Sequence, residues 1–283
     1  DGIRDLTVTG VQMCSSDLTS AVAIAVALNA ERCEIYTDVD GVYTADPNVV
    51  PDARKMDRVS YDEMLEMSSL GAKVLQFRCV EFCKKFDMPL VVKSSLVEDS
   101  KGTLICEEDS SMEQPVVSGI MIDKNQAKIT VKGVPDHPGI ASKFFTGLAE
   151  ENLSVDMIIQ NVSDEGHTDI SFTVKKEDIN KATKIVQELG KLIEARNVSA
   201  DPNICKVSIV GAGMRSHPGV AAKMFSALSE ENINIMMIST SEIRVSCIIE
   251  EKYGELAVRV LHKAFKMTAA EKNSWLEGGA ESI

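Results

Sequence analysis

The sequence predicts an α/β protein in which one larger α/β region is followed by two smaller, repeated α/β units. Three observations favour this fold class. A helical pattern, a strand pattern and a polar loop follow one another between residues 19 and 47. The segment from His137 to Asn152 recurs from His217 to Asn232. Short runs of alternating apolar residues flank both copies, as strands of a half-buried sheet require.

Length and charge limit the class of protein. A chain of 283 residues is long enough for more than one hydrophobic core. Its net charge of −13 and pI near 4.9 oppose binding to phosphate backbones and anionic lipid, so we expect no nucleic acid and no membrane partner. No apolar run approaches the roughly 20 residues of a membrane span. Seven scattered cysteines without a secretory leader favour a cytoplasmic location.

The first region begins with an alanine-rich segment, residues 19–32, that is apolar on nearly all sides and therefore predicts a buried helix. A short strand follows from Cys33 to Asp38, and then a polar loop to Pro47. Ligands of open α/β sheets bind beyond the carboxyl ends of the strands. The loop lacks the glutamate that ends a calcium-binding loop, so we predict no metal site, and a plain Asp-Gly turn is the alternative interpretation.

The repeat defines the rest of the chain. Twelve of 22 aligned residues are identical from His137 and from His217 onward. Each copy predicts a strand, a His-Pro-Gly turn, a helix, two strands and a second helix, with Pro138 and Pro218 in the first helical turn. A βαββαβ unit needs a fourth strand. We therefore infer interleaving, in which residues 116–124 join the second unit and the segment near 195–201 completes the first.

These units resemble ACT domains, which are ferredoxin-like modules that bind amino acids. The resemblance implies an effector site between paired modules, beside the loop that opens the first helix. A helix N-terminus favours a carboxylate, and a nearby acidic side chain accepts an α-ammonium. Asp136 suits that role, whereas its counterpart Ser216 does not, so the two units are not equivalent as sites. A tight turn with a capped helix is an equally good account of the His-Pro-Gly corner alone.

The strings Thr37 to Pro47, Ser60 to Leu75 and Gly211 to Gly219 are similar to the aspartokinases, members of the amino-acid kinase family. The resemblance runs from about residue 19 to residue 265. It implies ATP-dependent phosphorylation of the side-chain carboxylate of L-aspartate to 4-phospho-L-aspartate, with Mg²⁺ accompanying the nucleotide, at the first step of lysine, threonine and methionine biosynthesis. It also implies nucleotide contacts at Thr37, Asp38, Tyr43, Lys73 and Val74.

Two features depart from the family pattern. Asn48 stands where the family usually has arginine, which removes one cation near the phosphates and weakens the expected binding of ATP. Residues 1–18 match nothing in the family and replace its glycine-rich run. We interpret them as a chimeric or sequencing-derived join. We therefore assign no catalytic residue and expect the chain as given to be an inactive fragment.

The resemblance further implies that lysine, threonine or both act as effectors, and that the modules pair across chains in a homodimer or a hetero-oligomer. For the apolar members of the effector set, ordinary core packing is an equally good account. The implied effector contacts are Asp136, Ala141, Ser154, Val155, Asp156, Gln160, Val220, Ala221, Asn234, Ile235, Ser241 and Glu242.

The predicted organisation places the C-terminal part of an amino-acid kinase α/β sandwich before two interleaved ferredoxin-like ACT domains. An alternative function is a stand-alone regulatory chain that binds amino acids without catalysis, which the loop from Thr37 onward disfavours. Cys79 and Cys83 predict a half-buried helical face rather than a zinc site. The predicted boundaries are 1–18 (atypical), 19–97 (kinase part), 98–115 (linker), 125–202 (first ACT domain), 116–124 with 203–266 (second ACT domain) and 267–283 (tail).

Overall fold

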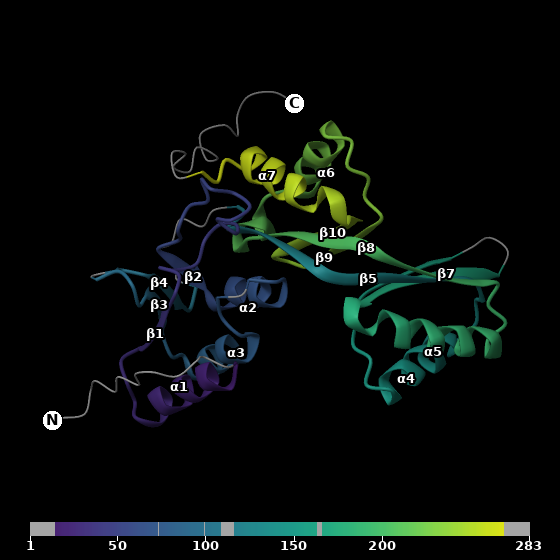
Figure 1. The fold of residues 1–283 in the computed structure, drawn as a ribbon, viewed down its shortest axis with the longest axis horizontal. Helices are drawn as coiled ribbons and strands as arrows, with labels where there is room; N and C mark the ends of the chain where they lie inside the picture. The colour runs from purple at the N-terminus through teal and green to yellow at the C-terminus, as the bar shows by residue number, and fades with distance from the viewer. Residues whose placement is uncertain (1–14, 73, 99, 109–115, 163–165, 269–283) are drawn as a thin grey trace.

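In the computed structural model the described residues form two β-sheets, one from strands between residues 33 and 106 and one from strands between residues 119 and 250 (Figure 1). The structure describes residues 15–72, 74–98, 100–108, 116–162 and 166–268. The first sheet has the strand order β1-β3-β4-β2, and the second has the order β6-β7-β5-β8-β10-β9. Most of the atypical segment, part of the linker and most of the tail therefore lie outside the described residues.

The first sheet is mixed. Strand β1 pairs parallel to β3, β3 pairs antiparallel to β4, and β4 pairs parallel to β2. Alternate residues of β1 and β3 are buried beneath the helices, which gives this region its own core. Its elements are α1 (Ser15–Ala27), β1 (Cys33–Thr37), β2 (Arg58–Ser60), α2 (Tyr61–Ser69), α3 (Phe77–Phe86), β3 (Leu90–Ser94) and β4 (Thr103–Cys106).

Strand β4 corrects a predicted boundary, because it lies inside the segment 98–115 that we assigned to a linker. Thr103 and Ile105 are fully buried in the first sheet. Four residues are too few to show a period in the sequence, so only the pairing with β2 and β3 identifies the strand.

Cys79 and Cys83 on α3 are fully buried rather than half-buried. Burial also raises the pKa of the nearby Cys33 thiol to about 11.

Helix α1 differs from the prediction in two ways. It begins at Ser15, inside the segment 1–18, rather than at residue 19. Val22 is fully buried, but Ile24 and Leu28 are about half exposed, so the helix is not buried on all sides. The reason is that α1 packs with one face on α3 and β1, and Ile24 and Leu28 lie outside that packed face.

The second sheet confirms the interleaving. Residues 119–123 of β5 pair with 206–210 of β8, and residues 128–132 of β5 pair with 197–201 of β8. Both strands therefore run through both units. The elements are β5 (Gly119–Pro135), α4 (Ile140–Glu150), β6 (Val155–Val162), β7 (His167–Lys175), α5 (Ile179–Leu192), β8 (Asn197–Val210), α6 (Val220–Glu230), β9 (Met237–Thr240), β10 (Arg244–Glu250) and α7 (Gly254–Ala264).

The two His-Pro-Gly turns have the same conformation. Gly139 and Gly219 are the N-cap residues of α4 and α6, with φ of 91° and 94°. Residues with a Cβ atom seldom adopt such a φ, which explains the glycine in both copies. The helices begin one residue after these glycines, so Pro138 and Pro218 precede the helices instead of standing in their first turns.

The two units differ in what they pack against. The core of unit one (residues 125–202) is made of its own residues, from Ala127 to Ile193. The core of unit two (residues 203–266) also includes Ala45, Val50 and Ala53 of the first region. Figure 1 shows α4 and α5 at the far side of the molecule from α1 and α3. Among the described residues, therefore, unit two and not unit one shares a hydrophobic core with the predicted nucleotide loop.

Candidate functional site

The predicted nucleotide loop starts at the carboxyl end of β1. Thr37 is almost fully buried, and its carbonyl oxygen accepts hydrogen bonds from the backbone N–H (2.8 Å) and the hydroxyl (2.9 Å) of Ser95, which follows β3. The Thr37 hydroxyl donates to the Val39 carbonyl at 2.8 Å. These bonds fix the ends of two parallel strands at one edge of the sheet and leave Asp38 exposed there.

A hydrogen-bonded cluster occupies the middle of the loop. The Tyr43 hydroxyl donates to Oδ1 of Asp40 at 2.6 Å, and the Lys55 ammonium donates to Oδ2 at 3.2 Å. The hydrogen bond from Tyr43, with the Lys55 charge, holds the pKa of Asp40 below its ordinary value. The same bond raises the pKa of Tyr43 to about 12. At neutral pH this part of the loop therefore holds an ionised carboxylate and a neutral phenol.

The loop is also bound to helix α7 of unit two. The Thr44 hydroxyl lies 3.0 Å from Nε2 of His262, and both side chains are buried. The same hydroxyl accepts the backbone N–H of Arg54 at 3.0 Å. Because a threonine hydroxyl has one proton, this arrangement lets Thr44 donate to the histidine while accepting from Arg54. Sequence reasoning missed His262, since a lone histidine in a helical pattern gives no signal of its distant partner.

Helix α2 forms a second contact between the first region and unit two. Glu63 is buried and forms a capping box with Ser60. One oxygen of its carboxylate accepts a hydrogen bond from the Ser60 hydroxyl at 2.9 Å. Its other oxygen accepts the Ser118 hydroxyl at 2.5 Å and the backbone N–H of Ala212 at 3.0 Å. One carboxylate therefore joins α2, the start of β5 and the end of β8.

The remaining nucleotide residues lie elsewhere. Val74 is half-buried against the core beneath the helices of the first region, whereas Tyr43 packs against the core of unit two. No core cluster of the described residues contains both side chains. Lys73 lies outside the described residues.

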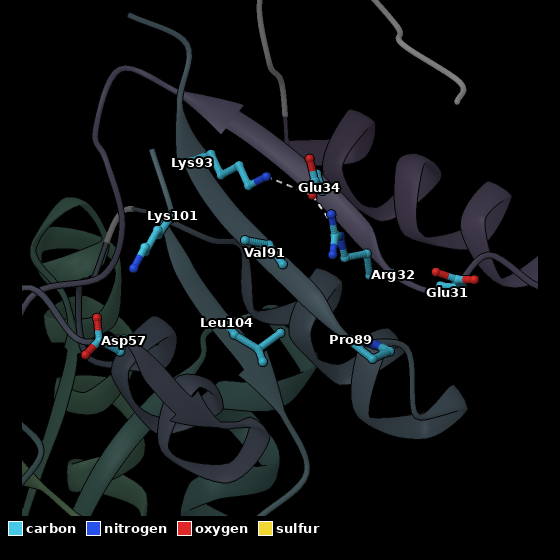
Figure 2. Close-up of a pocket in the computed structure, with 10 residues that line it drawn as sticks. Glu31, Arg32, Glu34, Asp57, Pro89, Val91, Lys93, Lys101 and Leu104 are labelled. Carbon is cyan, nitrogen blue, oxygen red and sulfur yellow. Dashed lines mark hydrogen bonds and ion pairs between the residues drawn. The ribbon is translucent and has the colours of Figure 1, made fainter. Parts of the chain in front are cut away.

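A cavity of about 630 Å³ lies on the face of the first sheet that carries the outward side chains of β1 and β3 (Figure 2). Glu34 accepts hydrogen bonds from Arg32 (2.8 Å), Lys93 (2.9 Å) and Tyr36 (2.8 Å). Burial opposes ionisation of Glu34, but the bonds from Lys93 and Tyr36 outweigh it and lower the pKa. None of the predicted nucleotide residues lines this cavity, so we do not assign it to the nucleotide.

The implied effector residues of unit one lie around the start of α4 and on β6. Asp136 and Ser154 are exposed, Ala141 is half-buried, and Gln160 is exposed in register with Ile170 of β7. Val155 packs against the core of unit one. Asp156 accepts a hydrogen bond from the Lys206 ammonium, which comes from β8 of unit two. This contact brings one implied effector residue directly against the other unit.

The implied effector residues of unit two are spread along the unit. Val220 is buried and Ala221 half-buried at the start of α6. Asn234 is exposed before β9, and Ile235 packs against the core of unit two. Ser241 and Glu242 are exposed in the turn between β9 and β10, where Glu242 lies 3.4 Å from Nε of Arg215.

No group of three or more histidine, cysteine, aspartate or glutamate side chains in the described part of the chain is arranged to hold a metal ion. Among those same residues, no helix has the length and apolar character needed to cross a membrane.

Two family models match the sequence. The Amino acid kinase family matches residues 4–94, and the ACT domain family matches residues 129–189 and 207–265. The first match begins at residue 4, so the prediction that residues 1–18 match nothing in the family is wrong for most of that segment. Together the two matches cover the first region and both repeated units, in the order that the resemblance implied.

Known aspartokinases are similar to this chain. The aspartokinase of Pseudomonas aeruginosa is 55% identical over 253 residues, which are 89% of this chain and 61% of that protein. A chain of the crystal structure of aspartokinase alpha and beta subunits is 57% identical at a TM-score of 0.51, over 53% of this chain and 99% of that chain. This chain belongs to the aspartokinase family. It spans about three fifths of the length of the curated relatives that it matches.

The fold of this family member also matches E. coli aspartokinase III in two states. The TM-score is 0.76 for the R-state complex with aspartate and ADP, at 28% identity over 88% of this chain and 56% of that chain. It is 0.68 for the T-state complex with lysine and aspartate, at 28% identity over 88% of this chain and 55% of that chain.

Proposed function

We propose that this chain forms part of an aspartate kinase, which transfers a phosphoryl group from ATP to the side-chain carboxylate of L-aspartate. The observation that carries the proposal is the loop beyond β1, where Thr37 is fixed, Asp38 is exposed and Asp40 is held ionised. The relative from E. coli, solved with aspartate and ADP, supports it. The product is 4-phospho-L-aspartate, at the entry to lysine, threonine and methionine biosynthesis in the cytoplasm.

The residues around the loop suit a nucleotide with Mg²⁺. Nε of Arg54 is a buried donor without a hydrogen-bond partner, and Lys55 stands beside it. Both are cations that suit phosphate oxygens. Asp38 offers an exposed carboxylate of the kind that Mg²⁺ prefers. Bound ATP supplies the phosphoryl group and Mg²⁺ neutralises its charge, while the protein positions the reactants.

We further propose that lysine, threonine or both regulate this kinase through the ACT units, which pair in a homodimer or a hetero-oligomer. The relative from E. coli was solved with lysine in its T state, which supports an amino-acid effector. An effector acts only through different contacts in two states of the kinase. The contacts of unit two with α2 and with the nucleotide loop provide a physical connection for that coupling.

Calorimetry with Mg·ADP tests the kinase assignment. We expect the chain to bind Mg·ADP, and Asp38→Asn to weaken binding roughly tenfold because a carboxylate contact to Mg²⁺ is lost. Asp52→Asn, an exposed aspartate in the same region, serves as the matched control and leaves binding unchanged. Absence of Mg·ADP binding contradicts the assignment.

In an assay for aspartyl phosphate we expect no turnover from these 283 residues, and measurable turnover contradicts that expectation.

A stand-alone regulatory chain is the second candidate. In the crystal structure of aspartokinase alpha and beta subunits, one chain is matched over 99% of its length by 53% of this chain. The structure of the regulatory subunit of aspartate kinase from Thermus thermophilus is matched to the same extent, at 44% identity and a TM-score of 0.51. The same titrations separate the candidates. A chain that binds lysine or threonine but not Mg·ADP favours the regulatory function.

A further inference from the structure

Two exposed apolar side chains lie beside the predicted nucleotide loop. Leu96 and Val97 come directly after β3, and they are 80% and 57% exposed. Neither belongs to any hydrophobic core formed by the described residues. A single exposed leucine is ordinary in a folded protein, but here two such side chains are adjacent at an edge of the sheet where a ligand is expected.

The backbone that carries Leu96 is held in place. The Leu96 N–H donates to the hydroxyl of Ser94, a buried residue, at 3.1 Å. Ser95 donates through its N–H and its hydroxyl to the carbonyl oxygen of Thr37, at the end of β1. Three hydrogen bonds therefore fix the start of this turn, and the exposure of Leu96 belongs to an ordered position rather than to a frayed strand end.

The turn and the nucleotide loop lie at the same edge of the first sheet. Strands β1 and β3 are parallel, with Thr37 in register with Ser94, so Asp38 and Leu96 both follow the last paired residues of neighbouring strands. Asp38 is exposed. This edge therefore presents a free carboxylate beyond β1 and free apolar surface beyond β3, next to each other.

The other apolar residues implied for the nucleotide are already packed. Tyr43 is half-buried against the core of unit two, and its hydroxyl is bonded to Asp40. Val74 is half-buried against the core of the first region. A nucleotide combines anionic phosphates with a base that has two apolar faces, and sites for such ligands combine a few charged groups with apolar side chains. Leu96 and Val97 offer apolar surface that no core of the described residues uses.

We propose that Leu96 packs against a face of the nucleotide base and thereby contributes to the affinity for ATP. Leu96 is the more exposed of the two side chains, and its own N–H is fixed. The base covers apolar surface that the free protein leaves in water, and this burial favours binding. The contact uses the face of the base and none of its hydrogen-bonding groups, so it is a determinant of affinity rather than of the choice between bases. This inference rests on the proposed kinase function.

Calorimetry with two ligands tests the contact. Mg·ADP carries the base, whereas Mg·pyrophosphate carries only phosphates. We expect Leu96→Ala to weaken Mg·ADP binding roughly three- to tenfold and to change Mg·pyrophosphate binding less than about twofold, because only the base loses a contact. Leu96→Phe retains an apolar surface and should bind Mg·ADP within about threefold of the unmodified chain. Leu192→Ala is the matched control, since Leu192 is also 80% exposed but ends α5 in unit one, and it should leave both affinities unchanged.

The failure of this contact is distinguishable from the failure of the kinase function. If the unmodified chain binds no Mg·ADP, the proposed function fails and the contact fails with it. If Mg·ADP binds and Leu96→Ala does not weaken it, the function stands and the role of Leu96 is overturned. Equal losses for Mg·ADP and Mg·pyrophosphate, equal losses in Leu96→Ala and Leu192→Ala, or a loss in Leu96→Phe as large as in Leu96→Ala also overturn it.

Discussion

The two ACT units have the same fold but different surroundings. They share the order of elements and the two glycine N-caps, at φ of 91° and 94°. Unit one closes a core of its own around the rings of Phe144 and Phe172, which meet edge to face. Unit two shares its core with the nucleotide loop and binds it through His262. Homologous modules in one chain can therefore have separate roles, because coupling depends on what each one packs against.

The comparison indicates a direction for regulation. Unit one is joined to unit two by the long strands β5 and β8 and by the Lys206–Asp156 contact. Unit two contacts the first region directly through Glu63 and Glu66. A change at the unit interface therefore acts on the nucleotide loop through the contacts of unit two.

Equivalent core truncations give the largest expected effect. Phe144→Ala and Met224→Ala stand at matching repeat positions, and both side chains are fully buried. We expect losses of about 3–5 and 2–5 kcal/mol in the free energy of unfolding. Phe144→Ala should produce a separate early transition of unit one, whereas Met224→Ala should lower stability across the first region as well. Calorimetry with hydrogen exchange measures both, and a single shared transition in Phe144→Ala contradicts the independence of unit one.

Removal of the Glu63 carboxylate is expected to cost about 3 kcal/mol. Glu63→Ala loses the capping box and leaves the buried N–H of Ala212 and the hydroxyl of Ser118 without an acceptor. Asp62→Ala is the control, since its pair with Lys84 is about 40% exposed and contributes little. Denaturant unfolding measures the difference. Equal effects of the two substitutions would show that Glu63 does not connect the two regions.

Substitution of two buried threonines, Thr44 and Thr173, distinguishes a loss of stability from a loss of coupling between unit two and the nucleotide loop. Thr44→Val leaves Nε2 of His262 and the N–H of Arg54 without this partner, at a cost of about 1–2 kcal/mol. Thr173→Val in unit one removes an acceptor for the Met157 N–H at a similar cost. We expect only Thr44→Val to weaken Mg·ADP binding in calorimetry. A similar weakening by Thr173→Val argues against a specific role for the His262 contact.

The ion pair between Arg244 and Glu66 is expected to have a smaller effect. The two side chains are 2.9 Å apart and about three-quarters buried, so Arg244→Met should cost about 0.5–1 kcal/mol and less at high salt. Arg259→Met removes an exposed pair within α7 and serves as the control. Unfolding at low and high salt checks the prediction, which fails if the cost does not decrease with salt.

The titration of Tyr43 reports on the packing of the nucleotide loop against unit two, and its expected effect is the smallest. Its hydrogen bond to Asp40 raises its pKa to about 12, so the bond stabilises the fold below the ordinary tyrosine pKa of 10 and is lost as pH rises toward 12. We expect ultraviolet absorbance to show a tyrosine that titrates near pH 12 and is absent in Tyr43→Phe, whereas Tyr61, whose pKa is also raised by burial, still titrates late in that variant. In Met224→Ala the Tyr43 phenol should titrate earlier, whereas Phe144→Ala should leave it unchanged. The reverse pattern contradicts the shared core of the loop and unit two.

Much of the fold was predictable because its signals are local. The repeat, the strand alternation and the interleaving of residues 116–124 follow from periodicity and from the need for a fourth strand. Strand β4 was missed because four residues carry no period. The exposed face of α1 was missed because an apolar pattern does not reveal how many sides of a helix are covered.

The candidate site was less predictable, because its charges act through long-range pairs. The nucleotide and effector residues were named from the family resemblance, and the contacts do not test them. Lys206 stands in the sequence as an ordinary lysine at the start of an apolar strand. Its burial and its pairing with Asp156, where the repeat-equivalent Lys128 meets the sulfur of Met236 instead, follow only from the strand register and the packing of the edge strands.

Residue order alone therefore specified the elements, the repeat and the family, since hydrophobic period, turn glycines and motif strings are properties of neighbouring residues. Folding specified which copy of the repeat contacts the nucleotide loop and which lysine meets a carboxylate. Those outcomes depend on atoms brought together from positions 50 to 218 residues apart, as with Lys206 and Asp156 or Thr44 and His262. The packed cores bring such side chains into contact. The residues next to each side chain in the sequence give no indication of its partner.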